Sequence, residues 1–248
     1  MELPFDLASE QGIFLAAALV VAAFIRGLSG FGFSAVFILL AALVTNPLPL
    51  IPVVFACEIG MTVFQAKGIR PNIDWSRAKF LLFGSAVAIL PSVAVMARLE
   101  VDQARLVISI LIMTLSIVLL SGWSLKSDVG SKGTFAVGIA AGMANSAGVG
   151  GLVAAAFFTA QPIPAAVFRA TMIVFLTGLD MMSLPVMGSH GLIGPDTFRA
   201  FFFAFPILGL GVWLGALGYK RITQTGFRRM VIIMLTVLSI INVAKVLL

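Results

Sequence analysis

Five long tracts of this chain contain no Asp, Glu, Lys or Arg. They cover residues 27–57, 80–97, 106–125, 133–168 and 200–219. A helix that crosses the hydrocarbon core of a bilayer needs about 20 such residues. Overall, 60% of the residues are hydrophobic and 10% are charged, too few polar side chains to cover a soluble domain of this size. The composition excludes a soluble enzyme, a secreted disulfide scaffold, a disordered chain and a nucleic-acid-binding domain, and it predicts an all-α membrane protein.

The tracts at 27–57 and 133–168 are too long for one helix each, and Gly and Pro residues interrupt them. We therefore predict ten helical segments, some of them short or re-entrant, with no soluble domain or long linker between them. The segments lie near residues 11–26, 30–45, 48–67, 75–97, 102–123, 133–145, 148–160, 163–187, 196–218 and 226–247.

A pattern of prolines and glycines occurs twice along the chain. Three prolines recur at a spacing of 115 residues, and a Gly-x-Gly recurs at a spacing of 118. The matching stretches are 46–49 with 161–164, Pro91 with Pro206, and 29–33 with 147–151. We interpret the pattern as a duplicated five-segment unit, although an apolar background also produces chance matches. The first transmembrane repeat is then 1–125 and the second 126–248, within one integral membrane domain.

The basic residues favour one topology. If the first two segments of each repeat enter and leave on one face and the N-terminus is outside, ten Lys and Arg residues fall inside and four outside, as the positive-inside rule requires. If the first two segments of each repeat instead form one broken crossing, the best count is eight Lys and Arg residues on one side against six on the other. The inside set is Lys67, Arg70, Arg77, Lys79, Lys126, Lys132, Lys220, Arg221, Arg228 and Arg229, and the outside set is Arg98, Arg105, Arg199 and Lys245. Because five steps is an odd number, the second repeat is inverted, which predicts a 5+5 inverted-repeat arrangement.

The two glycine-rich breaks, 26–33 and 145–151, are the best candidates for a binding site. Glycine lets the backbone turn and lets a ligand approach it closely. A helix that restarts after a break points free N–H groups and a positive dipole end at the gap, which suits an anion. The alternative is that glycines let helices pack closely. We prefer packing for Gly138, Gly142, Gly209, Gly211 and Gly215, and a site for the two breaks.

Charged residues at membrane depth are costly and therefore functional hypotheses. Arg26 either contacts an anion or extends to the cytoplasmic headgroups. Arg169 suits a sulfonate or carboxylate, which a guanidinium clamps with two hydrogen bonds. Glu58 and Asp180 are candidates for proton coupling, with a structural hydrogen bond as the alternative for each. The spacing of 115 residues pairs Asp180 with Gln65, so at this position only the second repeat carries a titratable side chain.

Nothing in the sequence predicts a cofactor or a metal. The single His, His190, falls in a predicted loop, and one His with the single Cys, Cys57, cannot build a metal site. No Ser-His-Asp set is available without His190, so we do not predict an enzyme.

Several of these stretches resemble the TauE/SafE family of sulfite and organosulfonate exporters. The similarity rests on residues 26–32, Ile73-Asp74-Trp75, 148–151 and Phe168-Arg169-Ala170-Thr171, in order along nearly the whole chain. The resemblance implies a multi-pass cell-membrane protein, mostly bacterial, that moves small anions such as sulfite, sulfoacetate or thiosulfate. The chain differs at 30–33, where two Phe residues stand in place of the more glycine-rich run of some members.

The sequence therefore predicts a secondary transporter in the bacterial inner membrane that moves a small sulfur-containing or carboxylated anion by alternating access. A proton or another coupling ion and a homo-oligomer are left open, and a passive anion channel and a non-transport membrane subunit are the alternatives. Glycine N–H groups would bind the anion, Ser and Asn would orient it, Phe would form a wall and Arg would neutralise it. The predicted substrate-binding residues are Arg26, Ser29, Gly30, Phe31, Gly32, Phe33, Asn145, Ser146, Gly148, Gly150, Gly151, Arg169 and Thr171.

Overall fold

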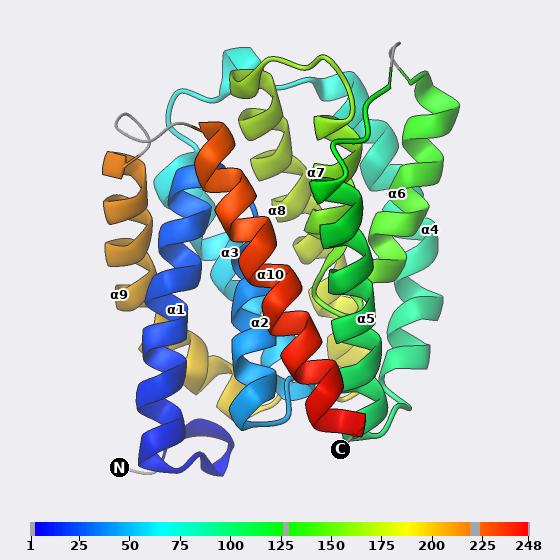
Figure 1. The fold of residues 1–248 in the computed structure, drawn as a ribbon. Helices are drawn as coiled ribbons and strands as arrows, with labels where there is room; N and C mark the ends of the chain where they lie inside the picture. Colours follow the sequence, from blue (N-terminus) through cyan, green and yellow to red (C-terminus); the bar gives the residue numbers. More distant parts are fainter. Residues whose placement is uncertain (1–2, 126–128, 219–223, 248) are drawn as a thin grey trace.

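The computed structural model describes residues 3–125, 129–218 and 224–247, and the regular structure in these ranges is helical throughout (Figure 1). The α-helices are α1 (Ser9–Ser29), α2 (Phe33–Val44), α3 (Ile51–Gln65), α4 (Trp75–Met96), α5 (Val101–Leu120), α6 (Ser131–Asn145), α7 (Gly150–Thr159), α8 (Ala165–Ser189), α9 (Pro195–Gly218) and α10 (Gln224–Leu247). Short 3-10 segments are η1 (Pro4–Asp6), η2 (Leu48–Leu50) and η3 (Arg70–Asn72). The ten predicted helical segments are confirmed, with boundaries that differ by a few residues.

Six of the described helical segments are long and apolar enough to cross a membrane. They are Ser9–Ser29, Leu48–Gln65, Trp75–Met96, Val101–Leu120, Ala165–Ser189 and Pro195–Leu217. In contrast, α2 and α7 have 12 and 10 residues. At 1.5 Å per residue they extend only about 15–18 Å, half of a hydrocarbon core. Figure 1 shows that α2 returns the chain to the end at which α1 begins, and that α7 does the same for α6 at the opposite end.

The two ends of the bundle carry different connections. The lower end in Figure 1 holds both chain termini and the connections α2–α3, α4–α5 and α8–α9, whereas the upper end holds α3–α4 and α7–α8. The described basic residues of the predicted inside set lie in loops or in the first two turns of helices that begin at the upper end, and the predicted outside set lies at the lower end. Lys126, Lys220 and Arg221 lie outside the described residues.

Two helix pairs pack through glycine. A Cβ atom at Gly27 of α1 would lie 2.5 Å from the Val212 carbonyl oxygen of α9, and one at Gly142 of α6 would lie 2.6 Å from the Ser85 carbonyl oxygen of α4. Gly138, Gly211 and Gly215 also face neighbouring helices too closely for a side chain, which confirms the packing prediction for them. The prediction is wrong for Gly209, where a Cβ would make an ordinary 3.6 Å contact with Phe64.

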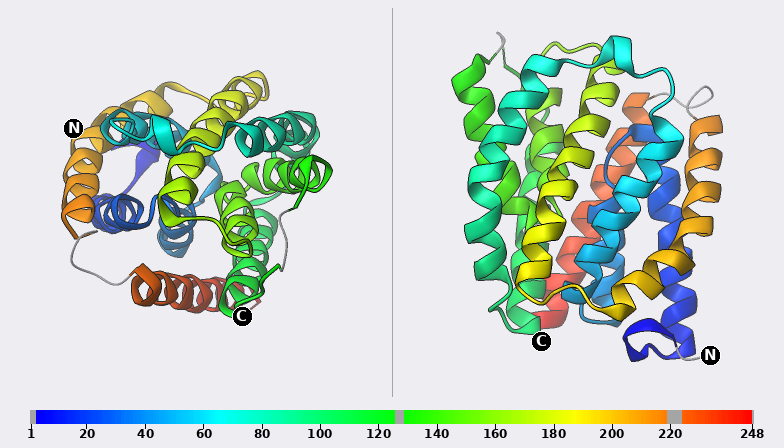
Figure 2. Two further views of the ribbon diagram at one scale, coloured as in Figure 1. Left: turned by 90° about the horizontal axis from the view of Figure 1, so that it is seen from above. Right: turned by 180° about the vertical axis from the view of Figure 1, so that it is seen from behind.

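The helices that position the site are α3 and α8, which lie side by side in the rear view of Figure 2, with α4 and α9 next to them. The end of α1 packs against α9, and α6 packs against α4 and α7. The two breaks, at the end of α1 and the end of α6, therefore lie on either side of the α3–α8 pair.

Candidate functional site

The first break is a tight turn between α1 and α2. Gly30 and Gly32 have φ angles of 83° and 89°, which an L side chain rarely adopts. The Ser29 hydroxyl donates to the Ile25 carbonyl over 2.8 Å and accepts the N–H of Phe31 over 3.3 Å. A Cβ atom at Gly30 would lie 2.9 Å from Cγ of Arg169 on α8. The two glycines thus reverse the chain directly against the start of α8. The Ser29 hydroxyl stabilises this reversal through its hydrogen bonds to nearby backbone.

The second break lies between α6 and α7 and is equally buried. Gly148 has a φ angle of 74°, and a side chain there would collide with Ile38 of α2 and contact Ile51 of α3. The Ser146 hydroxyl donates to the Met143 carbonyl over 2.8 Å. Gly150 and Gly151, the first residues of α7, leave no room for a Cβ atom against α6 and Leu176. Each break therefore packs against helices of the other half of the chain.

Aromatic rings connect the first break to both halves. Phe31 meets Phe168 of α8 edge to face, with ring centroids 5.8 Å apart, and Phe168 meets Phe158 of α7 in the same way at 6.1 Å. Phe33 is fully buried and stacks on Phe37 within α2. Phe31 thus lies between the break and α8, whereas Phe33 belongs to the interior of α2.

Arg26 is fully buried in the last turns of α1. Its Nη1 donates to Oε1 of Glu58 on α3 over 2.7 Å, and the two side chains are 0% and 2% exposed. The alternative in which Arg26 extends to lipid headgroups is therefore wrong. Nε and Nη2 of Arg26 have no hydrogen-bond acceptor among the described residues.

Asp180 of α8 lies in the same buried region, beside Glu58 and within range of the Arg26 charge. Its Oδ1 accepts Nδ2 of Asn145 over 3.4 Å, and that amide also donates to Ser183 over 3.0 Å. We call Arg26, Glu58, Asn145, Asp180 and Ser183 the carboxyl cluster. It joins α1, α3, α6 and α8, so it brings together two candidates, Glu58 and Asp180, that the sequence placed separately.

Arg169 lines a cavity of about 290 Å³ at the upper end of the bundle, between α3, η3, α8 and α9. Its Nη2 donates to the Gly27 carbonyl oxygen over 3.3 Å. Gln65, also in the wall, points Nε2 at the Arg26 carbonyl oxygen at 3.5 Å. Lys67 and Asn72 are the other polar wall residues. Sequence reasoning missed Gln65, Lys67 and Asn72 as wall residues, although the spacing of 115 residues pairs Gln65 with Asp180.

Thr171, predicted to bind substrate, makes a hydrogen bond within the protein. It is fully buried, and its hydroxyl oxygen accepts the backbone N–H of Asp74 over 2.9 Å. Asp74 in turn caps α4 by accepting the N–H of Arg77 over 3.0 Å. Thr171 therefore fixes the start of α4 against α8.

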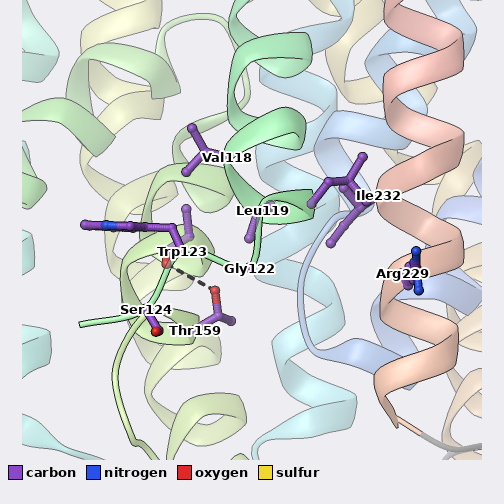
Figure 3. A pocket seen from close by; sticks show the side chains of 10 residues that line it. Val118, Leu119, Gly122, Trp123, Ser124, Thr159, Arg229 and Ile232 are labelled. Carbon is purple, nitrogen blue, oxygen red and sulfur yellow. Dashed lines mark hydrogen bonds between the residues drawn. The ribbon is translucent and has the colours of Figure 1, made fainter. Parts of the chain in front are cut away.

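A second cavity, of about 410 Å³, lies at the upper end where α5, α7 and α10 meet. Figure 3 shows Arg229 and Ile232 on one side of it and Trp123, Ser124 and Thr159 on the other. Thr159 donates to the Ala156 carbonyl oxygen over 3.1 Å. This cavity contains none of the predicted site residues.

The comparison with protein families decides the identity of the chain. The family model of the sulfite exporter TauE/SafE matches residues 14–241. The chain belongs to this family. The comparisons with curated proteins and with solved structures found no match.

TauE/SafE proteins are transporters and not enzymes, so the chain is a multi-pass transmembrane transporter, and the family implies an anionic sulfur compound as its substrate. The described residues of this TauE/SafE protein contain no group of three or more His, Cys, Asp and Glu side chains that could hold a metal ion. The charged side chains of the candidate site are those of Arg26, Glu58, Arg169 and Asp180, with Lys67 in the wall of the cavity.

Proposed function

We propose that this protein is a secondary transporter that carries a small sulfur-containing or carboxylated anion across the bacterial inner membrane by alternating access. The observation that supports it best is the presence of two arginines at the last turn of α1, Arg26 as one of its residues and Arg169 as a side chain bonded to its backbone. Arg169 lines a cavity and bonds to the Gly27 carbonyl, while Arg26, one residue earlier, is buried with two donor atoms that have no acceptor in the described structure.

Such a pair suits an oxyanion. A guanidinium presents parallel N–H groups that match the oxygens of a sulfonate or carboxylate. The first residues of α2 follow Gly30 and Gly32 directly, and their N–H groups have no partner within the helix. We place the anion between Arg169, Arg26 and the start of α2, with Phe31 as an apolar wall. The corresponding elements of the second break, Asn145 to Gly151, would take this role when the other side is open.

The helix packing supports the inverted repeat. If α1–α5 correspond to α6–α10, the contact of α1 with α9 has a counterpart in that of α6 with α4, and α3 with α9 in α8 with α4. α3 meets its own counterpart α8, and α5 meets α10. The hydroxyl groups of Thr62 and Thr177, which are 115 residues apart, lie 2.7 Å from each other. Two equivalent residues touch in this way only next to a twofold axis, which would run between α3 and α8.

The two ends of the bundle differ in a way that suits alternating access. Both polar-lined cavities described above lie at the upper end. At the lower end, the last two turns of α2 and Thr45 after them are held by side chains from α1, α5 and α10, which bond to their carbonyl oxygens. They are Gln11, Arg105, Asn242 and Lys245. We infer a state that is open at the upper end and sealed at the lower end.

A flux measurement tests the proposed function. The purified protein in liposomes is expected to move methanesulfonate and sulfite with saturation, and to show counterflow, in which external unlabelled anion drives out labelled anion. A channel would give flux without saturation or counterflow, and a non-transport subunit would give none. Either result would contradict the proposal, and liposomes without protein serve as the baseline.

The basic residues support a cytoplasmic upper end. In whole cells, an impermeant maleimide is expected to label Glu100→Cys at the lower end and to leave Lys132→Cys at the upper end unlabelled until the membrane is opened. Both positions are exposed, and the native Cys57 is fully buried, so it gives no background. The reverse labelling pattern would invert the proposed orientation.

A further inference from the structure

The carboxyl cluster has an unbalanced charge. Its titratable members are one cation, Arg26, and two carboxyl groups, Glu58 and Asp180, which are 0%, 2% and 0% exposed. With both carboxyl groups ionised, the cluster carries a net negative charge inside the protein, which is expensive in a medium of low dielectric constant. The remaining members, Asn145 and Ser183, are neutral hydrogen-bonding groups.

No other described charge faces the cluster from the helices around it. α2 and α7 contain no charged residue, and the charged residues of α4, α6 and α9 lie in the first two turns of these helices. Cys57, next to Glu58, is a buried thiol. Arg169 lies on α8 eleven residues before Asp180, about 16 Å along the axis. The excess negative charge is therefore not compensated by protein groups in the described part of the chain.

The hydrogen bonds of Asp180 also indicate that a positive charge is missing from the cluster. Oδ2 of Asp180 is buried and has no donor among the described side chains and backbone groups. The carboxyl group of Glu58 lies beside it, and two carboxyl groups can hydrogen-bond to each other only when one of them carries a proton. One proton would make the cluster neutral and also supply the missing donor.

We propose that Glu58 and Asp180 form a single site that holds one proton between them and binds it together with the transported anion. This inference rests on the proposed function. The proton is taken from water on the open side, forms an O–H bond with a carboxylate oxygen of the pair, and is returned to water on the other side. No other bond changes.

The last turn of α1 connects the proton site to the anion cavity. The side chain of Arg26 enters the carboxyl cluster, whereas the carbonyl oxygens of Arg26 and Gly27 meet Gln65 and Arg169 in the cavity wall. An anion that bonds to the unpartnered Nε and Nη2 of Arg26 adds negative charge beside the carboxyl pair and so favours its protonated form. By thermodynamic linkage, the proton must strengthen anion binding by the same factor.

Proton uptake on anion binding tests the inference. Methanesulfonate is a suitable probe because it stays ionised and carries no proton of its own. In unbuffered detergent solution with a pH indicator, at a pH high enough that the anion-free carboxyl pair has lost its proton, the wild type is expected to take up about one proton per anion bound. Asp180→Asn and Glu58→Gln each leave one carboxylate against Arg26. Both variants are expected to bind the anion with no proton uptake and with an affinity that no longer changes with pH.

The matched control is Asp102→Asn, which removes a 74% exposed carboxylate at the lower end and is expected to behave as the wild type. Anion binding by the wild type without proton uptake, or with proton release, overturns the inference, as does unchanged uptake by Asp180→Asn. An infrared spectrum separates the two proposals. The C=O band of a protonated buried carboxyl, recorded for the anion-free wild type at a pH below that of the uptake measurement and lost in Asp180→Asn, supports the proton site even if no anion binds, in which case the proposed function alone fails. A wild type that lacks that band at every pH at which it stays folded overturns the proton site.

Discussion

Replacing both buried carboxyl groups at once, Glu58→Gln with Asp180→Asn, is expected to cost about 3–5 kcal/mol of folding stability. Each single substitution leaves one carboxylate to balance Arg26, and should be tolerated. The double variant leaves the guanidinium fully buried with no counter-charge in the described structure, because Arg26 is 0% exposed and its ion pair is with Glu58. Thermal unfolding and gel filtration in detergent measure the loss directly.

The same argument predicts a rescue. Adding Arg26→Met to the double variant removes the stranded charge and fills much of its volume, so the triple variant is expected to recover most of the folded protein. It should nevertheless transport nothing, because the proposed anion contact and the proton site are both gone. If the double variant unfolds at the temperature of the single ones, the cluster is not held together by charge balance. A triple variant as unstable as the double one would point to packing as the cause.

Removing the second guanidinium is expected to weaken substrate binding strongly and to leave the fold intact. Hydrogen bonds to a charged group contribute about 1.5–3 kcal/mol, so Arg169→Ala should lower the affinity for methanesulfonate by about 10- to 150-fold. Arg169 lines the cavity and is only partly buried. Arg169→Lys keeps the positive charge but loses the planar guanidinium that can donate two parallel hydrogen bonds. Its affinity for the anion should lie between those of the wild type and Arg169→Ala. Equilibrium binding with labelled anion gives the affinities.

Arg199→Ala is the matched control for this prediction. Arg199 is 65% exposed at the lower end of α9 and pairs with Asp196 over 3.5 Å, far from the cavity in the chain's fold. Its removal should leave anion affinity within twofold of the wild type, as expected for a surface pair. Arg169→Ala binding as tightly as Arg199→Ala would remove Arg169 from the anion site.

The helices and both breaks could be predicted from the sequence because their causes are local. Uncharged tracts give the helices, and the breaks fall where Gly30 and Gly148 adopt positive φ angles that other residues disfavour. The short second segments were also visible, since Gly and Pro divide tracts too long for one helix. The two predicted sets of Lys and Arg residues fall at opposite ends of the bundle, because the order of the helices along the chain determines which loops share an end.

The contacts of single polar side chains could not be predicted, because they depend on which helices meet. Arg26 was ambiguous until its burial and its bond to Glu58 were known. Glu58 and Asp180 come together only because α3 packs against α8. Ser29 and Thr171 carry the polar groups expected of a binding site, yet in this structure the Ser29 hydroxyl bonds to the Ile25 carbonyl one turn earlier, and the Thr171 hydroxyl accepts the N–H of Asp74, 97 residues away. Spacing along the chain contains no information on the partner of Thr171.

If α1–α5 correspond to α6–α10 as proposed, the contacts of α3 with α8 and of α5 with α10 are of the isologous kind found in symmetric dimers, since each helix meets its counterpart. A five-helix half therefore presents a self-complementary face. Two fragments, cut between α5 and α6 and made as separate polypeptides, carry the surfaces needed to find each other within the bilayer. The peptide link between them would then fix their ratio and opposite insertion rather than the shape of the assembly.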